Sequence, residues 1–273
     1  MSHPPIQGVA PESTHEEGTP PPVGHTPLLT VDNITKSFGA VQALQGISFT
    51  VEKGKVVALV GDNGAGKSTL VKILSGVYPM DSGKFLLEGQ PCRFENPSDA
   101  RVAGVETVYQ DLALIEQLDV SDNVFLGKEY LYGGILGRWI GWLDRFRMRK
   151  QTSSALSQLH IKIPTPTLSV RRMSGGQRQC IAIGRALIWG SKLLIMDEPT
   201  AALGVDETEQ VLQMIEKLRN SQGFGFLIIS HNMQHVYRIA DKVVVLRQGK
   251  HKATLQKDQT TIQEIVSYIT GAK

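Results

Sequence analysis

The strongest chemical signal in the sequence is a glycine-rich loop that ends in lysine and hydroxyl residues. It comprises Gly61, Asp62, Asn63, Gly64, Ala65, Gly66, Lys67, Ser68 and Thr69, and its first eight residues fit the pattern G-x-x-x-x-G-K-S. Such a loop curls backbone N–H groups around phosphates, and the helix that follows adds partial positive charge. Lys67 would contact the β- and γ-phosphates, and the Ser68 hydroxyl can ligate Mg²⁺. The loop therefore predicts a nucleoside triphosphate site.

Two carboxylates follow a short apolar segment further along the chain. Asp197 and Glu198 come directly after Leu193–Met196, which reads as a buried strand. An acid at the end of such a strand can face the phosphate loop of a neighbouring strand. Asp197 would hold Mg²⁺, directly or through water, and Glu198 could orient and deprotonate an attacking water. The alternative is that the two acids only cap a loop, and the presence of a phosphate loop disfavours it.

A second candidate anion site lies 23 positions before Asp197. Ser174, Gly175, Gly176 and Gln177 precede a helical apolar pattern, and a serine followed by glycines at a helix start exposes N–H groups to an anion. One chain would then carry two helix N-termini suited to a triphosphate. The most economical arrangement is a pair of chains in which each completes the other's site.

The elements predicted around these residues alternate between strands and helices. Predicted strands are Leu28–Val31, Ile47–Val51, Lys55–Val60, Val105–Tyr109, Leu193–Met196, Phe226–Ile229 and Lys242–Leu246. Predicted helices are Lys67–Ser75, one that Asn96 caps, Asp206–Asn220, Asn232–Ala240 and one through Ile262–Ile269. This alternation predicts the α/β class, a largely parallel sheet covered by helices. Phe38 falls on the predicted loop between the first two strands. The stretch 111–190 lacks strand patterns and is predicted to be mostly helical.

Composition bears on order at the N-terminus, on the redox compartment and on the partners of the chain. Residues 1–27 hold seven of the 13 prolines and no Lys or Arg, so they predict a disordered extension, with a docking tail as the alternative. The two cysteines indicate a reducing compartment, and Cys180 is expected to pack in a core. The net charge of +3 is too small to indicate nucleic acid as a partner. Since no apolar run is long enough to span a membrane and no signal peptide is visible, any membrane role requires a partner.

The order of the motifs resembles that of ATP-binding cassette (ABC) proteins from about Leu28 to the C-terminus. The matching motifs are Gly61–Ser68, Gln110, Ser174–Gln177, Leu193–Asp197 with Glu198, and His231 after the next strand. The resemblance implies a P-loop NTPase core over 28–273, with a small antiparallel β portion and an inserted helical subdomain at roughly 111–190. It also implies ATP hydrolysis with Mg²⁺.

The resemblance further assigns roles to single residues. Phe38 would stack on adenine, although a core phenylalanine is the alternative. Gln110 would sense Mg²⁺ and the catalytic water, while His231 would contact the γ-phosphate and Glu198. The chain departs from the family at Gly204, where an aspartate is usual, and Asp206 is the acid that lies nearby in the sequence.

Three segments resemble the monosaccharide-uptake ATPases of the ribose, xylose and fructose type. These are Tyr109–Leu114, Asn123–Gly127 and Ala201–Val205, and the single cassette is similar to the fructose-type branch. The implied partners are a second ATPase subunit (a homodimer, or pairing with another cassette), a separate transmembrane permease and, indirectly, an extracytoplasmic sugar-binding protein. The implied location is the cytoplasmic face of the inner membrane. The alternatives are an energy subunit for a non-sugar ABC transporter and a non-transport ABC ATPase that acts on DNA or ribosomes.

Overall fold

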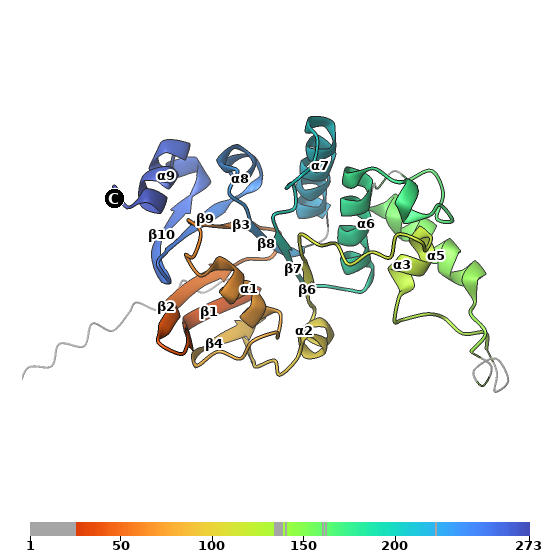
Figure 1. Cartoon of the computed structure of the whole chain (residues 1–273), viewed down its shortest axis with the longest axis horizontal. Helices are drawn as coiled ribbons and strands as arrows, with labels where there is room; N and C mark the ends of the chain where they lie inside the picture. Colours follow the sequence, from red (N-terminus) through yellow and green to blue (C-terminus); the bar gives the residue numbers. More distant parts are fainter. Residues whose placement is uncertain (1–25, 134–138, 140, 160, 162, 222) are drawn as a thin grey trace, which may run out of the picture.

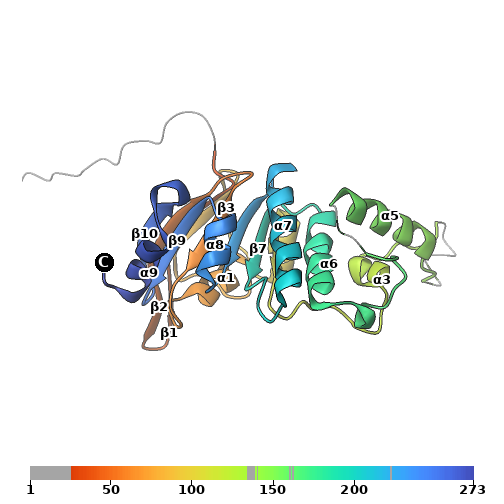
Figure 2. The same ribbon diagram turned by 90° about the horizontal axis from the view of Figure 1, so that it is seen from above.

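The computed structural model describes residues 26–133, 139, 141–159, 161, 163–221 and 223–273. The predicted N-terminal extension therefore lies almost wholly outside the described residues. Two sheets and the helices around them make up the body of the molecule, and a lobe of helices extends from one side (Figures 1 and 2).

The larger sheet has six strands in the order β10-β9-β3-β8-β7-β6. Its bounds are β3 Val56–Val60, β6 Val105–Val108, β7 Leu193–Asp197, β8 Gly225–Ile229, β9 Lys242–Arg247 and β10 Lys250–Gln256. All neighbours are parallel except β10, which runs antiparallel to β9. Every residue of β3 and β8 is buried, as expected for strands covered on both faces. The predicted α/β class is confirmed.

The smaller sheet is antiparallel, with the strand order β2-β1-β4-β5. Its strands are β1 Leu29–Phe38, β2 Val41–Val51, β4 Ser82–Leu87 and β5 Gln90–Cys92. The prediction that Phe38 lies on a loop between two short strands is wrong. Phe38 pairs with Val41 across a two-residue turn. Because the turn is this short, β1 extends to Phe38 and β2 begins at Val41.

Within the described residues, helices cover both sheets. They are α1 Lys67–Leu74, α2 Pro97–Ala103, α7 Val205–Ser221, α8 Met233–Ile239 and α9 Ile262–Thr270. The predicted cap of α2 is confirmed, because Asn96 Oδ1 accepts hydrogen bonds from the N–H groups of Ser98 and Asp99 at 2.9 and 3.2 Å.

The lobe consists of α3 Val120–Phe125, α5 Arg145–Gln158, the 3₁₀ turn Val170–Arg172 and α6 Gly175–Ile188. Its apolar side chains, such as Val124, Met148 and Ile181, join the core beneath the parallel sheet. Asn123 is fully buried and joins the lobe's entry loop to α3, since its side chain bonds both the N–H and the C=O of Ile115. The lobe is therefore packed as one piece with the sheet.

The two thiols should differ sharply in reactivity. Cys180 is buried on α6, and burial raises its pKa to about 11. Since only the thiolate reacts, Cys180 should carry about a hundredfold less thiolate at pH 8 than an ordinary cysteine. Titration with a chromogenic disulfide should count one fast thiol, Cys92, in the folded chain and two after denaturation. A Cys92→Ser protein should lose the fast phase, and two fast thiols would show that α6 is not packed as described.

Candidate functional site

The candidate site lies at one edge of the parallel sheet. Strands β3, β8, β7 and β6 are consecutive neighbours and run in the same direction. Their carboxyl ends lead respectively into the glycine-rich loop, His231, the pair Asp197 and Glu198, and Gln110. Parallel strands present these ends at one edge, which is where ligands bind in open α/β sheets.

The glycine-rich loop needs glycine at its last turn before α1. Gly66 has φ +100°, in the region that favours glycine, and a Cβ there would lie 2.7 Å from Ala43 O and 2.7 Å from Leu44 Cδ2. The loop is also closed by a hydrogen bond from the Ala65 N–H to Asp62 O at 3.1 Å. The N-terminal N–H groups of α1 are thus held at the end of β3.

Lys67 folds back into the centre of this loop. Its Nζ donates to Gly61 O at 2.6 Å and to Asp62 O at 2.9 Å. Burial holds the pKa of Lys67 below its usual value, while the charges of Glu198, Asp62 and Asp197 act in the opposite direction. The Lys67 ammonium group is therefore attracted electrostatically by the carboxylates of Asp197 and Glu198.

Asp197 and Glu198 occupy different environments at the end of β7. Burial, and then the charge of Glu198, raise the pKa of Asp197, whereas Lys67 lowers it. Glu198 has the left-handed φ of +52°, unusual for a residue with a side chain, and its N–H donates to Ile229 O at 2.9 Å. Its Oε1 lies 2.8 Å from His231 Nδ1. Among the described residues, the carboxylate that could act as a base is held through its Oε1, and the side chain of His231 is largely exposed.

A second contact joins the same two loops. Thr200 Oγ1 lies 3.1 Å from Nδ1 of His235, which is on α8, four residues after His231. Burial lowers the pKa of His235, and the charges of Arg238 and His231 add to the effect. A lowered pKa favours the neutral imidazole, which can form a hydrogen bond with the Thr200 hydroxyl. The loop after Glu198 is therefore tied to the helix after His231.

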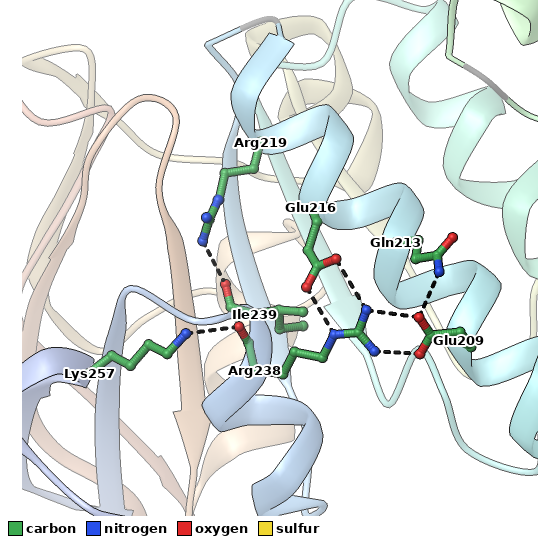
Figure 3. Close-up of polar contacts among 7 residues, drawn as sticks. All are labelled: Glu209, Gln213, Glu216, Arg219, Arg238, Ile239 and Lys257. Atoms are coloured by element: carbon green, nitrogen blue, oxygen red, sulfur yellow. Dashed lines mark hydrogen bonds and ion pairs between the residues drawn. The ribbon is translucent and has the colours of Figure 1, made fainter.

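Arg238, three residues after His235 on α8, links α8 to α7 (Figure 3). Its guanidinium bonds Glu216 through Nε at 2.9 Å and also contacts Glu209, to which one of its N–H groups donates at 3.0 Å. Lys257 and Arg219 reach the last carbonyls of α8, those of Arg238 and Ile239, at 3.0 and 3.2 Å. Sequence reasoning missed this network. The spacing of Glu209 and Glu216 by seven residues places both on one helix face and was the available signal.

Ser174 and Gln177 begin α6 as a reciprocal cap. The Gln177 N–H donates to Ser174 Oγ at 3.3 Å, and the Ser174 N–H donates to Gln177 Oε1 at 3.1 Å. Both glycines between them are close to Glu207, since a Cβ on Gly176 would lie 2.9 Å from Glu207 Cβ. The predicted helix start is confirmed, and no larger residue fits there without movement.

Glu207 is a second residue that the sequence reasoning missed. Its Oε2 accepts a hydrogen bond from the N–H of Gly204 at 3.2 Å, and this bond, followed by those from Ser174 and Gly176, lowers its pKa. Glu207, rather than Asp206, therefore supplies the carboxylate beside Gly204. Its stabilised charge also shows that the start of α6 accommodates an anion.

The structure does not bring every predicted site residue together. Figures 1 and 2 both place α6 on the far side of α7 from α1, so Ser174–Gln177 and the glycine-rich loop belong to separate parts of the chain. Gln110 is exposed in the bend after β6. Phe38 is 44% exposed, with its ring 5.3 Å from that of Tyr78 and Lys36 Nζ 5.5 Å from its centroid.

Fold and site together define an ATP-binding cassette. Residues 44–201 match the family described as ABC transporter. The chain belongs to this family, and it is an ABC ATPase that binds and hydrolyses ATP.

Within this family, the chain is similar to ATP-binding proteins of sugar importers. The chain is 44% identical to the fructose import ATP-binding protein FrcA of Rhizobium meliloti, over 90% of this chain and 95% of that protein. It is also 44% identical to the xylose/arabinose import ATP-binding protein XylG of Sulfolobus acidocaldarius, over 89% of this chain and 94% of the relative. It matches 46% of the ribose import ATP-binding protein RbsA of Yersinia pestis, with 41% identity over 90% of this chain.

A solved structure agrees with this assignment. The ADP conformation of an ATP-binding cassette of an ABC transporter superposes with a TM-score of 0.74 at 26% identity, covering 89% of this chain and 95% of that one. The cassette fold, with its P-loop, antiparallel sheet and lobe, is thereby confirmed.

Proposed function

We propose that this chain is the subunit that energises import of a monosaccharide through a separate permease. The similarity to FrcA, which extends over nearly the full length of both chains, carries this proposal. XylG supports the same cargo class. Other ABC functions, in non-sugar transport or away from membranes, lack a comparable observation in their favour.

The glycine-rich loop is the proposed triphosphate site. Lys67 exchanges its two carbonyl contacts for the β- and γ-phosphates, and the N–H groups of Gly61–Thr69 surround them. Phe38 is exposed enough to stack on the adenine ring. Ser68, Asp197 and Gln110 would hold Mg²⁺, because hydroxyl, carboxylate and amide oxygens at one sheet edge suit a hard cation. Bound Mg²⁺ would neutralise charge on the phosphates.

Glu198 is the proposed general base. His231 holds one carboxylate oxygen, so the other is free to accept a proton from the attacking water. The left-handed backbone at Glu198 and the Thr200 contact with His235 fix where that oxygen lies. His231 is also exposed and would contact the γ-phosphate.

Two such chains are proposed to pair head to tail. The helix that Ser174 caps, α6, lies across α7 from the chain's own α1 (Figure 2), which supports a role for Ser174–Gln177 at the triphosphate of a second chain. The partner's γ-phosphate would then take the place at the start of α6 where Glu207 now lies. Within the described residues no helix combines the length and apolarity needed to cross a bilayer.

The remaining assignments follow from the same proposal. A permease would dock beside Gln110, between the sheet and the helical lobe, at the cytoplasmic face of the membrane, and an extracytoplasmic sugar-binding protein would select the cargo. The extension 1–27, the cassette 28–273 and the helical subdomain at about 111–190 remain proposed boundaries.

Uptake of labelled sugar by cells that lack this gene tests the proposal. Restoring the wild-type chain should return uptake of at least one of fructose, xylose or ribose. Restoring a Glu198→Gln chain should not, because the transporter would bind ATP without completing its cycle. Monosaccharide uptake that is the same with and without the chain would contradict sugar import and leave the ATPase assignment intact.

A further inference from the structure

Large apolar side chains gather on the surface at the far end of the lobe. The exposed members are Leu131 (40%), Tyr132 (47%), Trp139 (90%), Trp142 (66%) and Phe146 (75%). We call the described residues 130–132, 139 and 142–146 the aromatic hairpin. Other exposed apolar residues, such as Val102 on α2 and Val266 on α9, are distributed over separate elements. Single exposed residues are ordinary, whereas a cluster of aromatic side chains marks an interaction surface.

The base of the aromatic hairpin is a small antiparallel ribbon. Leu131 pairs with Leu143, the Tyr132 N–H donates to Trp142 O at 2.8 Å, and the Asp144 N–H donates to Tyr130 O at 2.7 Å. The Tyr132 and Trp142 rings also meet edge to face at 5.8 Å. These exposed rings are therefore held in place before any partner arrives, which reduces the entropy cost of binding.

The ribbon is anchored to the interior of the lobe. The Tyr130 ring lies 5.0 Å from that of Phe125, which is fully buried and contacts Trp189 at 5.2 Å. On the other side, Asp144 caps α5 by accepting from the Arg147 N–H at 2.9 Å. Movement of residues 130–132 and 142–146 is thus restrained by both the core and a helix.

Basic residues border these aromatic side chains. Between positions 128 and 150 the sequence holds six cations and two acids, a net charge of +4; the cations are Lys128, Arg138, Arg145, Arg147, Arg149 and Lys150, and the acids are Glu129 and Asp144. Arg145 and Arg149 also reach Asp122 and Asp119, at 3.4 and 3.6 Å. Those two carboxylates are only 15% and 13% exposed, whereas the arginines are 55% and 41% exposed. The side presented to solvent is therefore cationic.

The shape and position of this surface decide what partner fits it. Figures 1 and 2 both place α5, which follows the aromatic hairpin, at the end of the molecule farthest from the sheets, so this surface projects from the outer end of the lobe. Tryptophan and tyrosine prefer the boundary between lipid headgroups and hydrocarbon, and nearby Lys and Arg are attracted to anionic headgroups. We propose that the aromatic hairpin inserts into the interface of an anionic lipid membrane and so holds the subunit on the bilayer directly.

The chain's own tryptophans allow a direct test with the full-length protein. Trp139 and Trp142 are two of the three tryptophans, and the third, Trp189, donates its Nε1–H to Val124 O inside the lobe. Adding protein-free vesicles that contain anionic phosphatidylglycerol should shift the emission to the blue, and brominated lipid should quench it. Zwitterionic vesicles should produce a much smaller change, and high salt should weaken the binding.

Matched variants separate this role from folding. Trp139→Ser with Trp142→Ser should reduce co-flotation with anionic vesicles at least tenfold at unchanged basal ATPase activity. Arg147→Gln with Lys150→Gln should reduce it severalfold, and Val102→Ser should leave it unchanged. If the double tryptophan variant folds poorly, Trp139→Ser alone serves, because that side chain is 90% exposed. An unshifted emission spectrum with anionic vesicles, or binding only when the vesicles carry the permease, would overturn the proposal.

Discussion

Glu198→Gln protein should bind ATP with nearly unchanged affinity and hydrolyse it about 10²- to 10⁴-fold more slowly, the usual cost of losing a general base. The amide keeps the length of the side chain and can still bond His231, but it cannot accept a proton from water. ATP should therefore accumulate on the enzyme and hold two chains together. Size-exclusion chromatography in ATP should show a dimer that ADP does not produce.

The control for this result is Asp206→Asn, which removes the same charge from an exposed residue on α7. It should hydrolyse ATP at close to the wild-type rate. Steady-state hydrolysis by Glu198→Gln at the wild-type rate would remove Glu198 from the proposed role of base.

Replacement of Lys67 by alanine should act one step earlier, on nucleotide binding itself. The ammonium group now bonds two carbonyls of the loop and would transfer to phosphate, so its loss removes charge-assisted hydrogen bonds. We expect the Kd for Mg-ATP to rise about 10- to 100-fold, which corresponds to roughly 1.5–3 kcal/mol. Calorimetric titration measures this directly.

Lys84→Ala is the matched control, because Lys84 pairs with Asp32 on the antiparallel sheet and takes no part in the site. Its affinity for Mg-ATP should equal that of the wild type. An unchanged Kd for the Lys67→Ala protein would mean that the triphosphate binds elsewhere.

The features that sequence alone predicted are those encoded by a few neighbouring residues. The glycine-rich loop, the acids at the end of β7 and the helix start at Ser174 each depend on local spacing. The structure places the loop between β3 and α1, Asp197 and Glu198 at the end of β7, and Ser174 at the start of α6. The strands β4, β5 and β10 were missed because many of their residues are exposed. Their pairing depends on contacts with neighbouring strands.

Contacts between distant segments could not be predicted in the same way. Glu207 reaches the start of α6 only because α6 and α7 pack together, and Arg238 meets Glu209 across two helices. In each case tertiary packing determines the position, and a single sequence gives no measure of it.

The pairing of two chains around ATP is the claim on which the mechanism depends. Ser174→Asp tests it, since aspartate is as good a helix cap as serine but sets a negative charge against the partner's γ-phosphate, and also beside Glu207 of its own chain. Ser174→Asn supplies the same cap without the charge. The Asp variant should bind Mg-ATP as a monomer and hydrolyse almost none, and the Asn variant should retain more activity.

The most direct measurement is the ATPase rate of Ser174→Asp protein mixed with Lys67→Ala protein. Each alone should be nearly inactive. In a mixed dimer one site carries both defects and the other carries neither, so random pairing should restore up to about a quarter of the wild-type rate. Recovery of activity on mixing is the result that the account predicts. Hydrolysis at the wild-type rate by Ser174→Asp protein alone, as a demonstrated monomer, would contradict it.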